Sequence, residues 1–390
     1  MQPIKAPSTV TVECVAGFPA EIDALAARGP VDRGFLRAAW FAAATGDDGR
    51  TLIARRDDGS PLLAIPTAPA GPALVGMRAV PGSYWPFRSI LIAPDATAEE
   101  LVAALRHPVA GDMLMPMWRL GPVYADDPAV PKVKAAAGRA GWTVLTRRVG
   151  HSFTFDLAAA ADDGWPRKST RRRLAGYERQ LAEHGPVAVR HLHGAAWDDA
   201  VLDTLGAIEA NSWIARTTDG SGAKFLTAAQ RDLWRRALAD PALAGSLSAT
   251  ILSVGDAAIA FSFDLRAGDR QYAIASSYDD AWAAFRPGRI VTFHQFGQAH
   301  AQGVRTIDLG TGDSGYKREM GARAGCEILD LLVVRSRPAA SLLRIRWGEE
   351  SRIGRAGFLE GAGERRRFGD RIEPWLAAGA MAAAALTLAE

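Results

Sequence analysis

The stretch between residues 247 and 279 limits most strongly how this chain can fold. It reads LSATILSVGDAAIAFSFDLRAGDRQYAIASSYD, with apolar runs interrupted at VGDA and at RAGDR. Glycine at each interruption supplies the positive φ that a tight turn needs, so the stretch predicts three strands joined as antiparallel hairpins. A doubly wound sheet alternates its strands with helices, so three successive strands argue against that class.

Helices and strands surround these hairpins in a definite order. Apolar spacing and glycine or proline at the ends are the signals for the helices. We expect a strand at 187–192, helices at 195–213 and 224–240, and then, after the hairpins, a helix at 287–302, a strand at 304–309, a short helix at 315–321 and a strand at 327–335. This order predicts an α+β fold with a mixed, mostly antiparallel sheet flanked by helices.

The first 150 residues also mix the two kinds of element. We expect helices at 35–45, 96–108 and 129–142, two strands within 50–68 around a DDGS turn, a strand at 112–123 and a strand pair at 143–157. A chain of 390 residues exceeds one ordinary core, so two domains are expected. We place a first domain at 1–150, a second at 151–338 and a helical extension at 339–390.

The composition argues against several classes of protein. The formal charge is only +3, so no global field indicates nucleic-acid binding. Cys14 and Cys326 lie far apart without a CxxC pair, so neither a disulfide framework nor a metal site is expected. The first residues lack the apolar run of a secretory signal, and no run is long enough to span a membrane. We therefore expect a cytoplasmic protein without a metal.

A basic helix is expected where the chain reads GWPRKSTRRRLAGYERQLAEHG. Ser169 or Thr170 is a candidate N-cap, and Gly185 followed by Pro186 ends the helix. Two interpretations remain open: a solvated helix face, or a surface that contacts the phosphates of a nucleotide, a coenzyme or an RNA. The basic residues are Arg167, Lys168, Arg171, Arg172, Arg173 and Arg179.

The glycines of DLGTGDSG, residues 308–315, suggest two different sites. Their spacing is typical of the loop that binds a methyl-donor nucleotide after a first strand, with Asp330 as a candidate ribose-binding acid. That loop needs a long helix and further strand–helix units after it. Here the next expected helix is short and little chain remains, so we favour a different site.

The helix that begins in FRPGRIV is a candidate anion site. Pro287 suits a first helical turn, and the amides of Gly288, Arg289 and Ile290 are expected to point out of the helix end. The side chains of Arg286 and Arg289 lie beside these amides. The candidate pyrophosphate-binding group is therefore Arg286, Gly288, Arg289 and Ile290. An ordinary helix start is the alternative.

The next strand and helix carry candidate acid–base groups. Asp308 leaves the strand opposite its apolar residues, where it either accepts a proton or caps the following turn. Tyr316 is a candidate proton donor and Lys317 a candidate partner for an oxyanion. A surface helix start is the alternative for both.

These stretches resemble a known family. EANSW (209–213), SSYDDAWAAFRPGRIV (276–291), GVRTIDLGTGDSGYKREMG (303–321) and the basic helix are similar to the GNAT N-acetyltransferases, in their CelD/BcsL-like branch. The layout of two units is similar to FemAB-type proteins. The resemblance implies two tandem GNAT-like domains, the first of them degenerate.

What the resemblance implies is transfer of an acyl group, acetyl in the simplest case, from acetyl-CoA or another acyl-CoA to an amine acceptor. It implies Asp308 as the base or as a carboxylate that orients the amine, Tyr316 as the acid and Lys317 as support for a substrate anion. It also implies Glu209, Trp213 and Asp279 on the acceptor side; core packing is the alternative for Trp213. An amino sugar in polysaccharide or envelope metabolism is the expected acceptor. Two alternative functions remain: a FemAB-like transferase that uses aminoacyl-tRNA, and a non-catalytic GNAT-fold binding protein.

Overall fold

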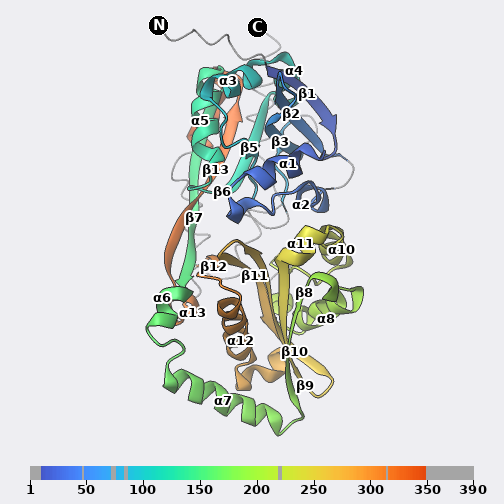
Figure 1. The fold of residues 1–390 in the computed structure, drawn as a ribbon, viewed down its shortest axis with the longest axis vertical. Coiled ribbons are helices and arrows are strands. Elements are labelled where there is room, and N and C mark those ends of the chain that lie inside the picture. Colours follow the sequence, from blue (N-terminus) through green and yellow to red (C-terminus); the bar gives the residue numbers. More distant parts are fainter. Residues whose placement is uncertain are drawn as a thin grey trace. The chain divides into compact units, whose positions relative to one another are not determined.

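We describe the protein from a computed structural model, in which residues 10–45, 48–71, 76–82, 87–217, 222–312 and 315–347 are described. The chain divides into two compact units, after Gly150 and again after Gly325. Among the described residues, unit 1 comprises 10–150 and 326–347, and unit 2 comprises 151–325 (Figure 1). Most of the extension expected at 339–390 lies outside the described residues.

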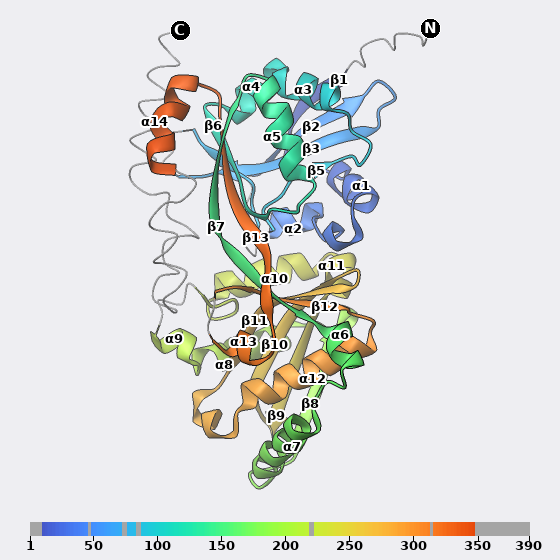
Figure 2. The same ribbon diagram turned by 90° about the vertical axis from the view of Figure 1, so that its left-hand side faces the viewer.

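Unit 1 begins with a strand and short helices, continues with strands, and closes with the last strand and helix of the described chain (Figure 2). Its elements are β1 (Val10–Ala16), α1 (Glu21–Arg28), η1 (Val31–Arg33), α2 (Ala38–Ala43), β2 (Arg50–Arg56), β3 (Pro61–Pro69), β4 (Arg78–Ala79), β5 (Leu91–Ile92), α3 (Ala98–Arg106), α4 (Pro108–Leu114), β6 (Met117–Tyr124), α5 (Ala129–Arg139), the first part of β7 (Thr143–Asp156), most of β13 (Arg323–Val334) and α14 (Arg337–Trp347).

Both units share one order of elements: a strand, helices, antiparallel strands, a helix, a strand and a helix. The elements of unit 2 are the end of β7, α6 (Leu157–Asp162), α7 (Lys168–Ala182), β8 (Val187–His193), η3 (Gly194–Ala196), α8 (Asp199–Ala210), α9 (Trp213–Thr217), α10 (Ala228–Leu238), α11 (Pro241–Ser246), β9 (Leu247–Val254), β10 (Ala257–Ala267), β11 (Arg270–Tyr278), η4 (Asp280–Phe285), α12 (Pro287–Ala301), β12 (Thr306–Thr311), α13 (Tyr316–Glu319) and the start of β13.

The three strands expected between 247 and 279 are confirmed as β9, β10 and β11. Gly255 and Gly268 in their turns have φ of 57° and 64°, the region that glycine enters without a steric cost. In unit 2 the strands lie in the order β8–β9–β10–β11–β12, and β12 pairs next with β7. Neighbours are antiparallel except β11 and β12, which run parallel.

The two faces of the unit 2 sheet are covered by different helices. Phe263 of β10 packs on Trp234 of α10, with ring centroids 4.7 Å apart. The next residue, Asp264, accepts a hydrogen bond from Gln295 of α12. Because successive strand residues point to opposite faces, α10 and α12 lie on opposite sides of the sheet. Ile290 of α12 is buried with Leu252 of β9, and Phe296 of α12 is buried with Ile307 of β12, so α12 crosses the sheet from β9 towards β12.

Two strands run from one unit into the other. The strand pair expected at 143–157 is wrong, because β7 is one uninterrupted strand. The structure also groups residues 326–338, which we expected with 151–325, with unit 1. The physical reason is that Ile328–Val334 of β13 pair antiparallel with β6, so this segment is hydrogen-bonded into the sheet of unit 1.

Several smaller expectations are also tested. Neither Ser169 nor Thr170 caps α7, whose N-cap is Arg167 without a side-chain hydrogen bond. Cys14 and Cys326 are both free thiols. Within the described ranges, no helix has the length and apolar character that crossing a bilayer requires, and no group of three or more candidate metal ligands gathers.

Candidate functional site

The parallel ladder between β11 and β12 is short. Its last aligned residues are Tyr272 and Asp308, although β11 continues to Tyr278 and β12 to Thr311. Directly after this point the register of β11 with β10 shifts, which leaves Ile274 without a partner in either neighbouring strand. Such a β-bulge frees backbone groups from the ladder and frequently lies beside an active site. Main-chain groups of unit 2 that can hydrogen-bond to a ligand are therefore expected at the end of the parallel ladder.

The helix that follows β11 begins in an unusual way. Arg286 precedes α12 with φ of 55° and ψ of 45°, Pro287 occupies the first turn, and no side chain caps the helix. A left-handed conformation at a residue other than glycine costs about 1–2 kcal/mol. A Cβ atom on Gly288 would lie 3.1 Å from Cδ1 of Tyr278, so the main chain at Gly288 packs closely against that ring. The start of α12 is thus held in place by β11.

The set of free amides at this helix start is smaller than we expected. The Ile290 N–H donates to the Arg286 carbonyl at 3.3 Å, as expected for the fourth helical residue, so the expectation that this amide is free is wrong. The Arg289 N–H donates to the same carbonyl at 2.9 Å. Of the three amides, only that of Gly288 has no hydrogen-bond partner among the residues that the structure describes.

An ion pair connects the start of α12 to α13. Nη2 of Arg289 lies 2.8 Å from Oε2 of Glu319, with the two side chains 51% and 65% exposed. Since α13 also carries Tyr316 and Lys317, this pair sets these residues close to the start of α12. A solvent-exposed pair of this kind contributes at most about 1 kcal/mol, so an anionic ligand can compete with Glu319 for the guanidinium.

Asp308 and Lys317 bind the same residue, Gly310. Oδ1 of Asp308 accepts from the Gly310 N–H at 2.8 Å, and Nζ of Lys317 donates to the Gly310 carbonyl at 3.2 Å and to the Thr311 carbonyl at 2.7 Å. Asp308 is 1% exposed and Lys317 is 5% exposed. The Lys317 ammonium also lies 5.6 Å from the centre of the Phe153 ring. These contacts match the turn-capping interpretation of Asp308 and contradict a surface position for Lys317.

Tyr316 occupies the first turn of α13, directly after Gly315. Gly315 has φ of 77°, which turns the chain from β12 into the helix. Tyr316 is 45% exposed and is one of the exposed large hydrophobic residues in the described part of the chain. The phenol is therefore accessible to a ligand from solvent, whereas its neighbour Lys317 is not.

The residues expected on the acceptor side have structural contacts. The buried Glu209 carboxylate accepts from the amides of Lys224 and Phe225, the latter at 2.7 Å, and burial raises its pKa. The Asp279 carboxylate accepts from the Ala281 N–H at 2.9 Å and so caps η4. Trp213 is half-buried at the start of α9. The Asp280 N–H donates to the Asn211 carbonyl at 3.1 Å, so the segments that carry these three side chains meet.

The methyl-donor interpretation is contradicted. Asp330 lies in β13 of unit 1 and is completely buried, where its carboxylate pairs with Arg119 and Arg147, each at 2.8 Å. Burial alone raises the pKa of Asp330, but the two guanidinium groups outweigh it and hold that pKa below its usual range. The helix after the glycine turn, α13, has only four residues. Asp330 is thus part of a buried ion cluster and not a ribose ligand.

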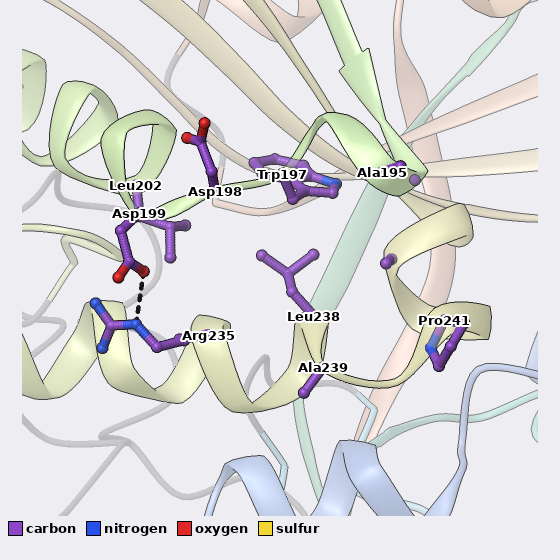
Figure 3. Close-up of a pocket in the computed structure, with 11 residues that line it drawn as sticks. Ala195, Trp197, Asp198, Asp199, Leu202, Arg235, Leu238, Ala239 and Pro241 are labelled. Carbon is purple, nitrogen blue, oxygen red and sulfur yellow. Dashed lines mark hydrogen bonds and ion pairs between the residues drawn. The ribbon is translucent and has the colours of Figure 1, made fainter.

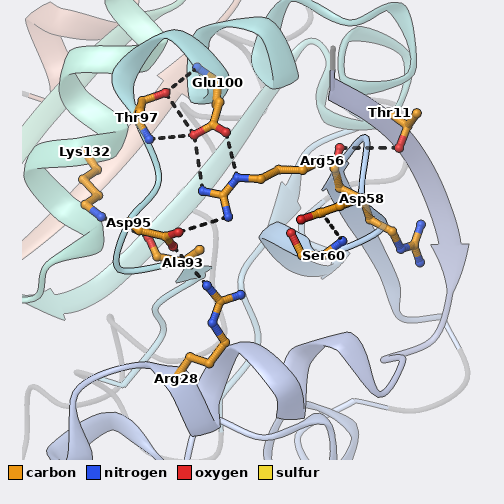
Figure 4. A network of polar contacts seen from close by, with 11 residues as sticks. Thr11, Arg28, Arg56, Asp58, Ser60, Ala93, Asp95, Thr97, Glu100 and Lys132 are labelled. Atoms are coloured by element: carbon orange, nitrogen blue, oxygen red, sulfur yellow. Dashed lines mark hydrogen bonds and ion pairs between the residues drawn. The ribbon is translucent and has the colours of Figure 1, made fainter. Parts of the chain in front are cut away.

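The helix of unit 1 that corresponds to α12 in element order begins with its own acidic cap (Figure 4). Oγ1 of Thr97 accepts from the Glu100 N–H at 3.2 Å, and the Glu100 carboxylate accepts from the Thr97 N–H at 2.8 Å. A hydrogen bond from Arg56 lowers the pKa of Glu100 to about 2. A carboxylate therefore already occupies the positive end of α3, which disfavours an anionic ligand there. Of these two corresponding helices, α12 has the open start.

A separate hollow of about 640 Å³ lies between η3, the start of α8 and the α10–α11 connection (Figure 3). Trp197 and Leu238 form part of its wall. Its charged groups already have partners: Arg235 donates to Asp199 at 2.7 Å, and Asp198 accepts from the Val201 N–H at 2.8 Å. None of the predicted site residues lines this hollow, so it is not the candidate catalytic site.

Three features of the site escaped sequence reasoning. Glu319 and Tyr278 become relevant only because chain segments far apart in sequence meet Arg289 and Gly288. The bulge at Ile274 has no local signal beyond small neighbouring residues. Of these three features, only Glu319 has a signal in the sequence, because it follows Tyr316 by three residues on the same short helix.

The comparison with protein families gives a match within unit 2. Residues 168–318 match the model of the family described as the acetyltransferase (GNAT) domain, which is less than half of the chain. A search of curated proteins finds no significant match. The matched segment contains the whole of α12 and the ladder between β11 and β12.

Solved structures share the fold over most of the chain. FemX is 12% identical with a TM-score of 0.54, and the match covers 85% of this chain and 99% of FemX. L-PGS from Bacillus licheniformis is 12% identical with a TM-score of 0.50, covering 85% and 96%. A conserved protein of unknown function from Bacteroides thetaiotaomicron VPI-5482 is 11% identical with a TM-score of 0.50, covering 81% and 97%.

Identities this low establish a likeness of fold alone. Together with the family match and the repeated order of elements in the two units, they confirm the expected fold class. The protein has an α+β fold of two tandem GNAT-like units, with mixed, mostly antiparallel sheets flanked by helices.

Proposed function

We propose that unit 2 is an N-acyltransferase that moves an acyl group, acetyl in the simplest case, from acyl-coenzyme A to an amine acceptor. The family matched by residues 168–318 supports an acyltransferase. The observation that carries the proposal is the open start of α12, where Gly288 follows Pro287 without a side-chain cap. We assign the protein to the CelD/BcsL-like branch and propose an amino sugar of polysaccharide or envelope metabolism as the acceptor.

The residues at the start of α12 fit a pyrophosphate. The amide of Gly288 has no protein partner among the described residues, and Arg286 and Arg289 are exposed beside it. A helix start also carries a partial positive charge that favours anions. The acidic cap of α3 leads us to propose one coenzyme site per chain, in unit 2, and to regard the first domain as degenerate.

The reaction needs two groups from the protein, since the proton of the amine passes to solvent water. When bound, the acyl coenzyme presents a thioester carbon at which the amine forms a C–N bond while the C–S bond breaks; the amine loses a proton and the thiolate gains one. We assign polarisation of the carbonyl oxygen to a main-chain N–H at the Ile274 bulge. We assign protonation of the thiolate to the exposed phenol of Tyr316.

Asp308 and Lys317 receive a positioning role in this proposal, in place of the catalytic roles that the resemblance implied. Both are buried and both bind Gly310, near the end of the strand β12 that precedes Tyr316. A lysine whose ammonium already donates to two carbonyls has little left to offer a substrate anion. Their contribution is to fix where α13 begins.

A FemAB-like transferase that uses aminoacyl-tRNA is the second candidate, and the exposed basic residues of α7 favour it. A third candidate is a binding protein that keeps the fold without the chemistry. Thermal stabilisation by acetyl-CoA but not by tRNA supports our proposal, because a ligand that binds the native state raises the melting temperature. Salt-sensitive binding of tRNA without stabilisation by acetyl-CoA supports the second candidate instead.

The decisive experiment is a transfer assay. Purified protein is incubated with acetyl-CoA and a panel of amines that includes amino sugars, and acylated products are detected by mass spectrometry. We expect one acceptor class to be acylated by the wild type and the product to decrease in an Arg286→Gln/Arg289→Gln variant. Stabilisation by acetyl-CoA with no product from any amine would leave the binding-protein candidate in place of ours.

A further inference from the structure

The helix α7 lies at the outer margin of unit 2 (Figures 1 and 2). All of its basic side chains are exposed. We call this set the α7 basic surface: Arg167, Lys168, Arg171, Arg172, Arg173 and Arg179.

None of these six side chains makes an ion pair or hydrogen bond with any described residue. The one acidic residue of the helix, Glu178, is bound elsewhere: its Oε1 lies 2.7 Å from Nε2 of His294 on α12. Solvated surface charges in proteins are usually interspersed with the opposite sign. A run of unpaired cations on a single helix therefore indicates an anionic partner.

The opposite face of α7 is not available to such a partner. Leu174 and Leu181 are 5% and 0% exposed and pack with Ile290 and Val291 of α12. Because its apolar stripe is covered by the protein, α7 cannot insert into a bilayer as a free amphipathic helix does. Any contact must be made by the charged face, with α7 held rigidly on unit 2.

Half-buried aromatic side chains lie at both ends of the α7 basic surface. Trp165, before the helix, packs against Phe293 and Phe296 with ring centroids 5.9 Å from each. After the helix, Trp282 and Phe285 of η4 lie against His184, at 5.6 and 5.1 Å. Tryptophan is enriched at the level of lipid headgroups, where one part of the ring is apolar and the other is hydrated.

We propose that the α7 basic surface docks unit 2 onto an anionic phospholipid membrane. Clusters of four to eight basic residues bind anionic headgroups in this way, by charge rather than by insertion. A single convex helix meets a flat surface along its whole length, whereas proteins that track a nucleic-acid strand surround it with a positive groove. The proposal does not depend on the proposed function.

The test is co-sedimentation of the full chain with vesicles. We expect binding to vesicles of phosphatidylcholine with 30% phosphatidylglycerol, no binding to phosphatidylcholine alone, and loss of binding in 0.5 M NaCl because salt screens the attraction. An Arg171→Gln/Arg172→Gln/Arg173→Gln variant should partition about a hundredfold less, since each basic residue near an anionic surface contributes about a factor of five. These side chains are exposed, so the variant should keep its melting temperature.

A matched control removes the same charge elsewhere. Lys134, Arg305 and Arg323 are exposed on three separate segments, and a Lys134→Gln/Arg305→Gln/Arg323→Gln variant should bind vesicles like the wild type. Equal loss in both triple variants would show a mere charge effect and overturn the proposal. Binding of tRNA that the α7 triple variant loses, with no binding to anionic vesicles, would also overturn it and make α7 an RNA surface.

Discussion

Arg289 on α12 and Glu319 on α13 form an ion pair of 2.8 Å across the start of the helix that we assign to the coenzyme. The pair has two consequences. It joins α13 to the first turn of α12, and it partly neutralises a cation that the pyrophosphate needs. When the coenzyme binds, the Arg289 guanidinium therefore exchanges the Glu319 carboxylate for a phosphate oxygen.

Glu319→Gln should therefore bind acetyl-CoA more tightly than the wild type. The exposed pair is worth at most about 1 kcal/mol, so the dissociation constant should fall about threefold. Arg289→Gln should raise it about tenfold, because a charge-assisted hydrogen bond to phosphate is lost. Isothermal titration calorimetry measures both. Weaker binding in Glu319→Gln would show that the pair organises the site rather than competing with the ligand.

Gly288→Ala should weaken acetyl-CoA binding. Its new Cβ would lie 3.1 Å from the Tyr278 ring, so the helix start or the ring must move. Gly297→Ala is the matched control on the same helix, since a Cβ there meets nothing within 4 Å. The control should bind normally and gain up to about 1 kcal/mol of stability from helix propensity. Titration with acetyl-CoA and thermal melts of both variants measure these effects.

Tyr316→Phe should lower the turnover number about a hundredfold or more while leaving the dissociation constant of acetyl-CoA within about twofold, because general acid catalysis contributes in the transition state. The phenol is exposed, so the fold should be unaffected. Steady-state kinetics with the acceptor found above, beside calorimetry, separate the two quantities. An unchanged turnover number would remove Tyr316 from the mechanism.

Lys317→Met should lower the free energy of unfolding by about 1–3 kcal/mol, because the carbonyls of Gly310 and Thr311 lose their donor. Asp308→Asn keeps an acceptor oxygen for the Gly310 amide and should cost less than Asp308→Ala. Urea unfolding at pH 7 measures all three. Full stability of Lys317→Met would return Lys317 to the list of substrate ligands.

Asp264 should make the stability of the protein fall as the pH rises. Burial raises the pKa of Asp264 to about 7, although hydrogen bonds from Ser262 and Gln271 oppose the shift. The folded state then holds this proton between about pH 4 and pH 7 while the unfolded chain releases it. Stability from this group is greatest at about pH 4, declines through pH 7 and is constant above it, with a total change of up to about 4 kcal/mol.

Asp264→Asn carries no titratable group and serves as the reference for that effect. We expect the difference in unfolding free energy between wild type and variant to decrease from pH 4 to pH 7, as measured by urea unfolding at each pH. The difference should then stay level from pH 7.5 to pH 9. A difference that does not change with pH would mean that Asp264 is ionised in the folded protein throughout.

The features that depend on neighbours in the chain were predictable. Gly255 and Gly268 marked the hairpin turns, and Pro287 marked the start of α12, because positive φ and a missing N–H are properties of the residue itself. The order of elements between 187 and 335 followed from such signals, and with it the expected fold class. Asp308 lay at its predicted place in the strand, with the turn-capping contact that sequence reasoning kept as an alternative.

The features that depend on the packing of distant segments could not be predicted from the sequence. The burial of Lys317, the pairing of Arg289 with Glu319, the bulge at Ile274 and the passage of β13 into unit 1 each join segments that the sequence does not place side by side. Side-chain type and spacing set what each segment can form by itself. Which groups remain open for a ligand is decided only when the folded chain supplies, or withholds, their partners.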